Sequence, residues 1–138
     1  NSHIHIMLYV MQETCSMRFD RLASATVALV MSLSAAFADA VLVMAEEPGC
    51  VWCARWNKEI SHIYPKTAEG IAAPLRRINI HDDLPNDLSF SRTLHFTPTF
   101  VLILNGVEVS RIEGYPGEDF FWGLLGQMLE NAKIELSG

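Results

Sequence analysis

Residues 40–53 read AVLVMAEEPGCVWC, an apolar run followed by a turn and by two cysteines three positions apart. The five consecutive apolar residues at 40–44 are typical of a short strand that is buried on both faces. Pro48 and Gly49 form a dipeptide that favours a turn, so the strand is expected to end before them. The stretch therefore predicts a buried strand that leads directly to Cys50.

A helix is expected to begin at Cys50. The unpaired backbone N–H groups of its first turn and the positive end of the helix dipole favour a thiolate there. Cys50 lies nearer to these groups than Cys53, so we expect Cys50 to be the nucleophile and Cys53 the resolving thiol of a redox-active pair. The apolar residues of this segment follow the spacing of one helical face, and Pro65 ends it: Cys53, Trp56, Ile60, Ile63 and Tyr64.

The rest of the chain predicts an alternation of helices and strands. Residues 66–73 show no strong period, whereas residues 75–80 read as a second strand and residues 88–94 as a short helix. Asn105-Gly106 favours a two-residue hairpin turn between strands at 100–104 and 107–113. A last helix starts at Glu118, and its expected buried residues are Phe121, Leu124, Leu125, Met128, Leu129 and Ala132. The order β-α-β-α-β-β-α predicts an α/β fold with a mixed central sheet and helices on both faces.

Two other uses of the cysteines stay open. A zinc site needs four ligands, and His62, His81 and His95 do not have the usual finger spacing from the cysteine pair. A purely structural disulfide would close a loop of only four residues and would constrain the unfolded chain little. A non-catalytic binding module with a Cys50–Cys53 disulfide is therefore the alternative of another class.

The first part of the chain has the pattern of a secretory signal peptide at residues 17–38. Two arginines precede an uncharged stretch at 22–38, which ends in the small-large-small sequence AFA. Cleavage after Ala38 or Ala40 fits the same rule. A retained membrane anchor is the alternative, although the serines and alanines make the stretch less hydrophobic than a typical transmembrane helix.

Residues 1–16 precede Met17, and we expect them to be absent from the mature protein. They contain Cys15 and the pair His3 and His5, which lacks a third metal ligand. The mature chain is then expected to be a single domain, residues 39–138.

The charge of the chain argues against a nucleic-acid partner. Ten Lys and Arg stand against sixteen Asp and Glu, a formal net charge of −6, and phosphate affinity depends on clustered basic side chains. Three cysteines are also too few for a disulfide-stapled scaffold. No metal site and no cofactor beyond the cysteine pair are expected.

Two further segments complete a recognisable arrangement. Thr97-Pro98-Thr99 precedes the hairpin, at a place where a cis proline would hold a loop rigid, and Gly114 follows the hairpin. With the C-x-x-C at a strand-to-helix junction, the chain resembles the thioredoxin fold family over residues 40–132. It is similar, more narrowly, to the periplasmic SoxS-type thioredoxins of bacterial sulfur oxidation, in the segments PGCVWC at 48–53, APLRR at 73–77 and GYPGEDFFW at 114–122.

This resemblance implies further substrate-binding residues around the cysteines. Thr97, before the cis proline Pro98, would pair through its backbone with the substrate, Gly114 would lie beside the cysteines, and Trp52 would be exposed between them. It also implies a periplasmic reductase of protein disulfides, in monomeric form, whose client is the sulfur-carrier complex of the Sox system and which a membrane electron donor re-reduces. Reduction of apocytochrome c and disulfide oxidation or isomerisation are the alternatives within this class.

One position departs from the family pattern. Thioredoxins carry a buried carboxylate six residues before the first cysteine, and this chain has Met44 there. Glu46 or Glu47 could take the proton of Cys53 through water, or could simply form a solvated acidic loop.

Overall fold

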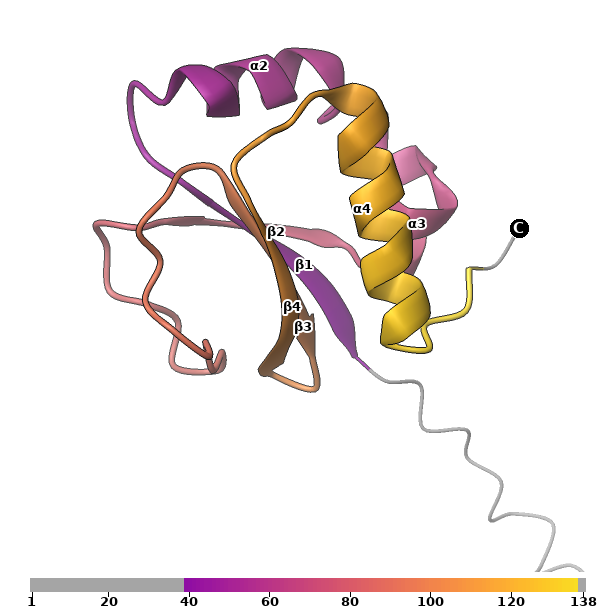
Figure 1. Cartoon of the computed structure of the whole chain (residues 1–138). Coiled ribbons are helices and arrows are strands. Elements are labelled where there is room, and N and C mark those ends of the chain that lie inside the picture. The colour runs from indigo at the N-terminus through magenta and orange to yellow at the C-terminus, as the bar shows by residue number, and fades with distance from the viewer. Residues whose placement is uncertain (1–38, 137–138) are drawn as a thin grey trace, which may run out of the picture. The chain divides into compact units, whose positions relative to one another are not determined.

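The computed structural model describes residues 39–136. The expected signal peptide and the segment before it, with Cys15, His3 and His5, lie outside the described residues. The described elements, drawn in Figure 1, are β1 (Ala40–Glu46), α2 (Val51–Glu59), the 3-10 turn η1 (Tyr64–Lys66), α3 (Ala68–Ala72), β2 (Leu75–Asn79), β3 (Thr99–Leu104), β4 (Val107–Glu113) and α4 (Glu118–Asn131).

The strands form one mixed sheet in the order β2-β1-β3-β4. β1 pairs in parallel with β2 and antiparallel with β3, and β3 pairs antiparallel with β4. Residues 42–45 of β1 are fully buried, because Leu42 and Met44 face one apolar cluster while Val43 and Ala45 face another. The expected doubly buried strand is therefore confirmed, and it is an inner strand of the sheet.

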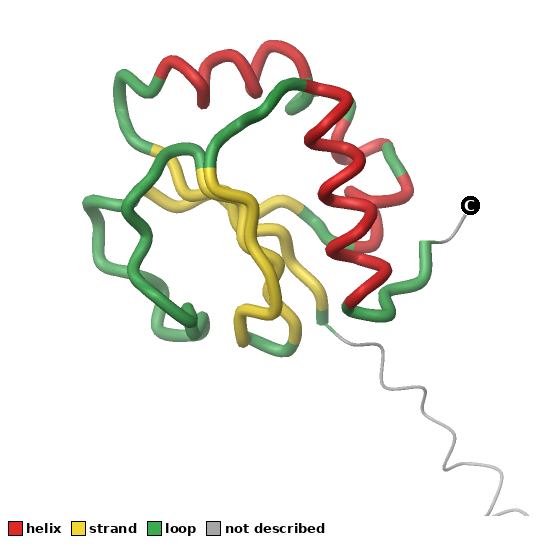
Figure 2. Tube along the Cα trace, in the orientation of Figure 1, coloured by secondary structure: helices red, strands yellow, loops and turns green. Residues whose placement is uncertain are grey.

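One face of the sheet is covered by the helices α2, α3 and α4, as Figures 1 and 2 show. Its centre is aromatic: the ring of Trp56 lies 5.3 Å from that of Phe100 and 5.8 Å from that of Phe121. The Trp56–Phe121 pair is edge-to-face, a contact that adds about 0.5–1.5 kcal/mol to the burial of the rings. This cluster, which also contains Cys53, fixes α2 and hence the cysteines on the sheet.

The other face is covered by the loop at residues 80–98 and not by a helix. The α/β fold with a mixed sheet is confirmed, but the helix expected at 88–94, and with it a helical layer on both faces, is wrong. The backbone of Ser89 instead pairs with the hairpin, donating to the carbonyl of Gly106 (2.7 Å) and accepting from the N–H of Glu108 (2.9 Å). These bonds hold Ser89 in extended conformation, while Leu88, Phe90 and Leu94 insert toward the sheet.

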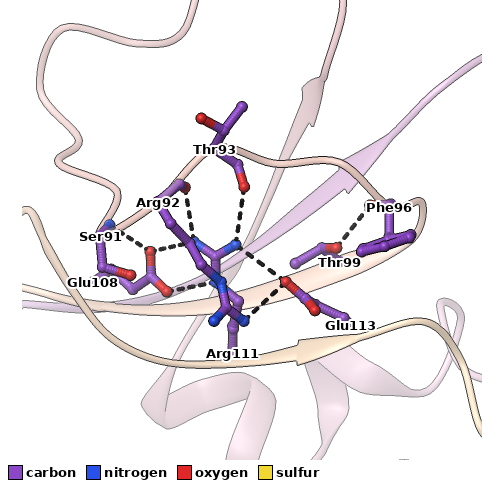
Figure 3. Close-up of polar contacts among 8 residues, drawn as sticks. All are labelled: Ser91, Arg92, Thr93, Phe96, Thr99, Glu108, Arg111 and Glu113. Carbon is purple, nitrogen blue, oxygen red and sulfur yellow. Dashed lines mark hydrogen bonds and ion pairs between the residues drawn. The ribbon is translucent and has the colours of Figure 1, made fainter.

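A buried ion pair fastens this loop to β4, as Figure 3 shows. Arg111 Nε donates to Glu108 Oε1 at 2.6 Å, and the two side chains are only 6% and 5% exposed. Glu108 also accepts from the backbone N–H of Ser91 (2.8 Å), and Arg111 donates to the carbonyls of Arg92 (3.0 Å) and Thr93 (3.4 Å). The pair therefore supplies the hydrogen bonds that a helix at this place would have made internally.

Glu108→Gln is expected to lower the free energy of unfolding by about 2–3 kcal/mol at pH 7, because it leaves a buried guanidinium without its full counter-charge. Burial alone would raise the pKa of Glu108, but the bonds from Arg111 and Ser91 outweigh it and hold that pKa below the ordinary glutamate value. The carboxylate therefore stabilises the fold at neutral pH, and this contribution is lost as the pH falls through the lowered pKa.

Urea denaturation at pH 7 and pH 3 measures this effect. The difference between wild type and Glu108→Gln should shrink at pH 3, because a glutamate of ordinary pKa is already protonated in the unfolded chain at that pH. Glu130→Gln, on the exposed side of α4, is the matched control. Equal losses in the two variants at pH 7 would argue against a special role for the buried pair.

Helix bounds differ from the expected ones in two places. α2 ends at Glu59, several residues before Tyr64, and a turn and η1 follow. The short helix α3 lies in the stretch without a strong period; Thr67 caps it by accepting from the N–H of Gly70 at 3.0 Å. A helix of one to two turns is too short to display a periodic apolar face.

The hairpin and the last helix follow the sequence closely. Asn105 and Gly106 have φ values of 52° and 81°, which is the left-handed conformation that the predicted turn requires. α4 begins at Glu118 as expected, but Leu124 is 40% exposed rather than buried. Trp122 packs against the core instead, stacked on Tyr64 with ring centroids 6.1 Å apart.

Candidate active site

Cys50 and Cys53 form a disulfide at the N-terminus of α2. Cys50 is the N-cap residue, and its Sγ accepts from the backbone N–H of Cys53 at 3.0 Å. Gly49, with φ at 82°, allows the sharp turn from β1 into the helix. Cys53 is only 3% exposed, whereas Cys50 is partly buried. Once the disulfide is reduced, the more accessible sulfur is also the one at the helix terminus with an N–H directed at it.

The loop before β3 supplies a second element of the site. The Thr97–Pro98 peptide bond is cis, and Pro98 is buried. The carbonyl of Pro98 accepts from the N–H of Gly114 at 2.7 Å, so the residue after β4 is tied to this loop. The structure thus brings Gly114 against the loop of Thr97 and Pro98.

Trp52 is half exposed between the two cysteines. The Arg55 guanidinium lies over its ring at 5.8 Å from the centroid and over the Tyr115 ring at 6.0 Å. Glu59 binds both Arg55 and Tyr115: its carboxylate accepts from Arg55 Nε (3.0 Å) and from the Tyr115 hydroxyl (2.6 Å). The hydrogen bond from Tyr115, followed by that from Arg55, lowers the pKa of Glu59. Trp52 therefore packs against Arg55, which hydrogen bonds hold in place next to the disulfide.

The two glutamates after the buried part of β1 are both engaged. Glu46 accepts from Arg77 Nε (2.7 Å) and Nη2 (2.5 Å). Glu47 accepts from the Thr97 hydroxyl at 2.5 Å and lies 2.8 Å from His81 Nε2. The bonds from Thr97 and then from His81 lower the pKa of Glu47. The carboxylate of Glu47 is therefore a weak proton acceptor. Glu46 is held in an ion pair with Arg77, so neither side chain belongs to a merely solvated loop.

Met44 is fully buried in the same apolar cluster as Cys53. The position at which thioredoxins carry a carboxylate is therefore a packed thioether in this chain. Burial in such apolar surroundings favours the neutral form of a thiol over the thiolate.

No three His, Cys, Asp or Glu side chains in residues 39–136 cluster in a way that could hold a metal ion. Over the same residues, no helix is both long enough and apolar enough to cross a membrane.

Sequence reasoning missed the contacts around the cysteines. Arg55 and Glu59 are four residues apart on a helix, a spacing that indicates an ion pair, and this signal was available. The bond between Glu47 and Thr97 joins residues 50 positions apart and leaves no local pattern.

Comparison with known proteins reveals a similarity to a solved structure. No family model matches the chain, and no curated protein matches it either. Among solved structures, it is similar to the crystal structure of the periplasmic thioredoxin SoxS from Paracoccus pantotrophus in its reduced form. The two are 52% identical, the match covers 67% of this chain and 98% of that one, and the TM-score is 0.66.

Proposed function

Because the chain belongs to the SoxS-type thioredoxins and is a thiol–disulfide oxidoreductase, we propose that it reduces protein disulfides in the periplasm. The observation that carries the proposal is the Cys50–Cys53 disulfide at the start of α2, with the N–H of Cys53 directed at the sulfur of Cys50. This geometry stabilises a thiolate at the more accessible of the two cysteines.

The reaction proceeds in two exchanges. The Cys50 thiolate attacks one sulfur of the client disulfide, so that a mixed disulfide forms and the other client sulfur leaves as a thiolate. The Cys53 thiolate then attacks the sulfur of Cys50, which releases the first client sulfur and closes the Cys50–Cys53 disulfide. Two electrons pass from the enzyme to the client, and the thiolates that leave take up protons from water.

Trp52, Thr97, Pro98 and Gly114 are the proposed client-binding residues. Trp52 and the neighbouring Val51 are 52% and 75% exposed and offer apolar area beside the sulfurs. Among the hydrogen bonds of residues 39–136, none uses the backbone N–H or carbonyl of Thr97. An extended client segment can therefore pair with Thr97 as an added strand.

The proposed client is the sulfur-carrier protein of the Sox system, whose cysteine the enzyme would keep active. The likeness to periplasmic SoxS supports this choice. The oxidised enzyme must then receive two electrons from a membrane donor, because the periplasm is kept oxidising. Residues 17–38 are the proposed export signal, cleaved after Ala38 or Ala40, and the mature protein is proposed to be a monomer without a cofactor.

Cys53→Ser is expected to accumulate a covalent complex with the client, because the mixed disulfide on Cys50 can no longer be resolved. Cys50→Ser should accumulate none, and the double variant is the matched control. Non-reducing electrophoresis followed by mass spectrometry of the trapped partner measures both the complex and its identity. Equal trapping by the two single variants would overturn the assignment of roles.

The identity of the trapped protein separates the candidates within the class. A sulfur-carrier protein supports the proposed client, whereas an apocytochrome c supports a role in cytochrome maturation. The reduction potential separates a reductase from an oxidase, since about 30 mV corresponds to ~1.4 kcal/mol for this two-electron couple.

A further inference from the structure

Glu47 joins the redox pair to the loop that carries Thr97. It is the first residue after β1, and its carbonyl accepts from the N–H of Cys50 at 3.3 Å. Its side chain reaches the other way, where Oε1 accepts from the hydroxyl of Thr97 at 2.5 Å. A single residue thus spans from the attacking cysteine to the proposed docking edge of the client.

The second carboxylate oxygen of Glu47 is also held. His81 Nε2 lies 2.8 Å from Oε2, and the backbone N–H of His81 donates to Asn79 Oδ1 at 3.0 Å. With a partner on each oxygen, the carboxylate cannot turn away from Thr97 without losing a hydrogen bond.

Glu46, the residue before Glu47, binds the opposite side of the turn between β1 and α2. Glu46 is bound by Arg77 of β2, and the same guanidinium donates to Asn57 Oδ1 of α2 at 2.9 Å. Adjacent glutamates therefore tie the strand-to-helix turn to β2 and α2 through Glu46, and to the Thr97 loop through Glu47. The redox pair is held between these two anchors.

We propose that Glu47 is a positioning residue for protein clients: it sets the separation between the sulfur of Cys50 and the free backbone edge of Thr97. A client strand paired to Thr97 must present its disulfide to Cys50, so both elements have to be held at one spacing. A small disulfide needs only the sulfur of Cys50. The inference rests on the proposed function and adds to it a determinant of selectivity for extended polypeptide substrates.

The test compares the rate constants of the reduced enzyme for insulin and for 2-hydroxyethyl disulfide, and takes the ratio of the two. In Glu47→Ala this ratio should fall about five-fold, the equivalent of the ~1 kcal/mol that one hydrogen bond contributes. Thr97→Val, which removes the hydroxyl at constant shape, should give a similar fall. Glu47→Gln and Thr97→Ser keep an acceptor and a hydroxyl, so both should restore the ratio to near that of the wild type.

A double variant and a charge control complete the design. Glu47→Ala combined with Thr97→Val should lower the ratio no further than either change alone, because both remove the same bond. Asp83→Asn removes one negative charge from an exposed position two residues after His81 and should leave the ratio at the wild-type value. If Glu47→Ala does not fold, the rate ratios of Thr97→Val and Thr97→Ser are compared instead.

Three results would overturn the inference. The ratio in Glu47→Ala and Thr97→Val could stay within two-fold of the wild-type value, or the losses could add in the double variant. Asp83→Asn could also lose as much as Glu47→Ala. Failure of the proposed function has a different signature, since the wild type would then reduce neither disulfide faster than Cys50→Ser does.

Discussion

Cys50→Ser is expected to reduce insulin with dithiothreitol no faster than dithiothreitol alone. Disulfide exchange requires a thiolate, and a serine hydroxyl at the same helix terminus is not ionised at neutral pH. Cys53→Ser should be slower than the wild type, because only dithiothreitol can resolve its mixed disulfide with the client. The turbidity of the precipitating insulin chains measures the rate.

The same variant separates catalysis from a purely structural disulfide. Cys50 and Cys53 are three positions apart, so the bond closes a very short loop and its loss should lower the free energy of unfolding by only about 2 kcal/mol. Denaturation in urea measures this change beside the activity. Wild type and Cys50→Ser reducing insulin at one rate while differing in stability would favour the non-catalytic binding module.

Gly70→Ala is expected to destabilise the domain by about 3 kcal/mol, toward the upper end of the range for an overpacked site. A Cβ on Gly70 would lie 1.8 Å from the carbonyl oxygen of Tyr64, which is backbone and cannot rotate away. That oxygen also accepts from the N–H of Thr67 (3.1 Å) and from its hydroxyl (2.9 Å). The fully buried Tyr64 donates in turn to the carbonyl of Ala73 at 2.7 Å. The added methyl group therefore pushes apart a turn whose hydrogen bonds and packing are all satisfied.

Gly123→Ala is the matched control, since a Cβ there meets no atom within 4 Å on the middle of α4. It should stabilise the domain by about 0.5–1 kcal/mol through helix propensity alone. Thermal unfolding followed by circular dichroism reports both changes, and about 3 kcal/mol corresponds to a fall in Tm of roughly 12–24 °C in a domain of this size. Similar Tm values for the two variants would show that Tyr64 can move aside.

The parts of the fold that sequence could predict are those with local signals. The buried strand β1, the turn at Asn105-Gly106 and the two cysteines each lie in a short segment whose residue types permit few conformations. Their conformations do not depend on contacts with residues far away in the sequence. The exposure of Trp52 between the cysteines was instead expected from the resemblance to the thioredoxins.

The errors lie where a distant partner decides the conformation. Phe90 and Leu94 are four positions apart, so they fit a helical face as well as an extended loop. The pairing of Ser89 with the hairpin selects the loop. The Glu108–Arg111 pair that completes this choice is 17 positions or more from the backbone groups it binds. The bond from Thr97 to Glu47 has the same character, because it exists only once the sheet has formed.

Met44 gives the enzyme a dependence on its surroundings. A buried carboxylate beside the resolving cysteine would act as an internal proton reservoir, whereas a thioether can neither store nor release a proton. The lifetime of the mixed disulfide should then follow the acidity of the surrounding medium, and shorten as that medium becomes more alkaline.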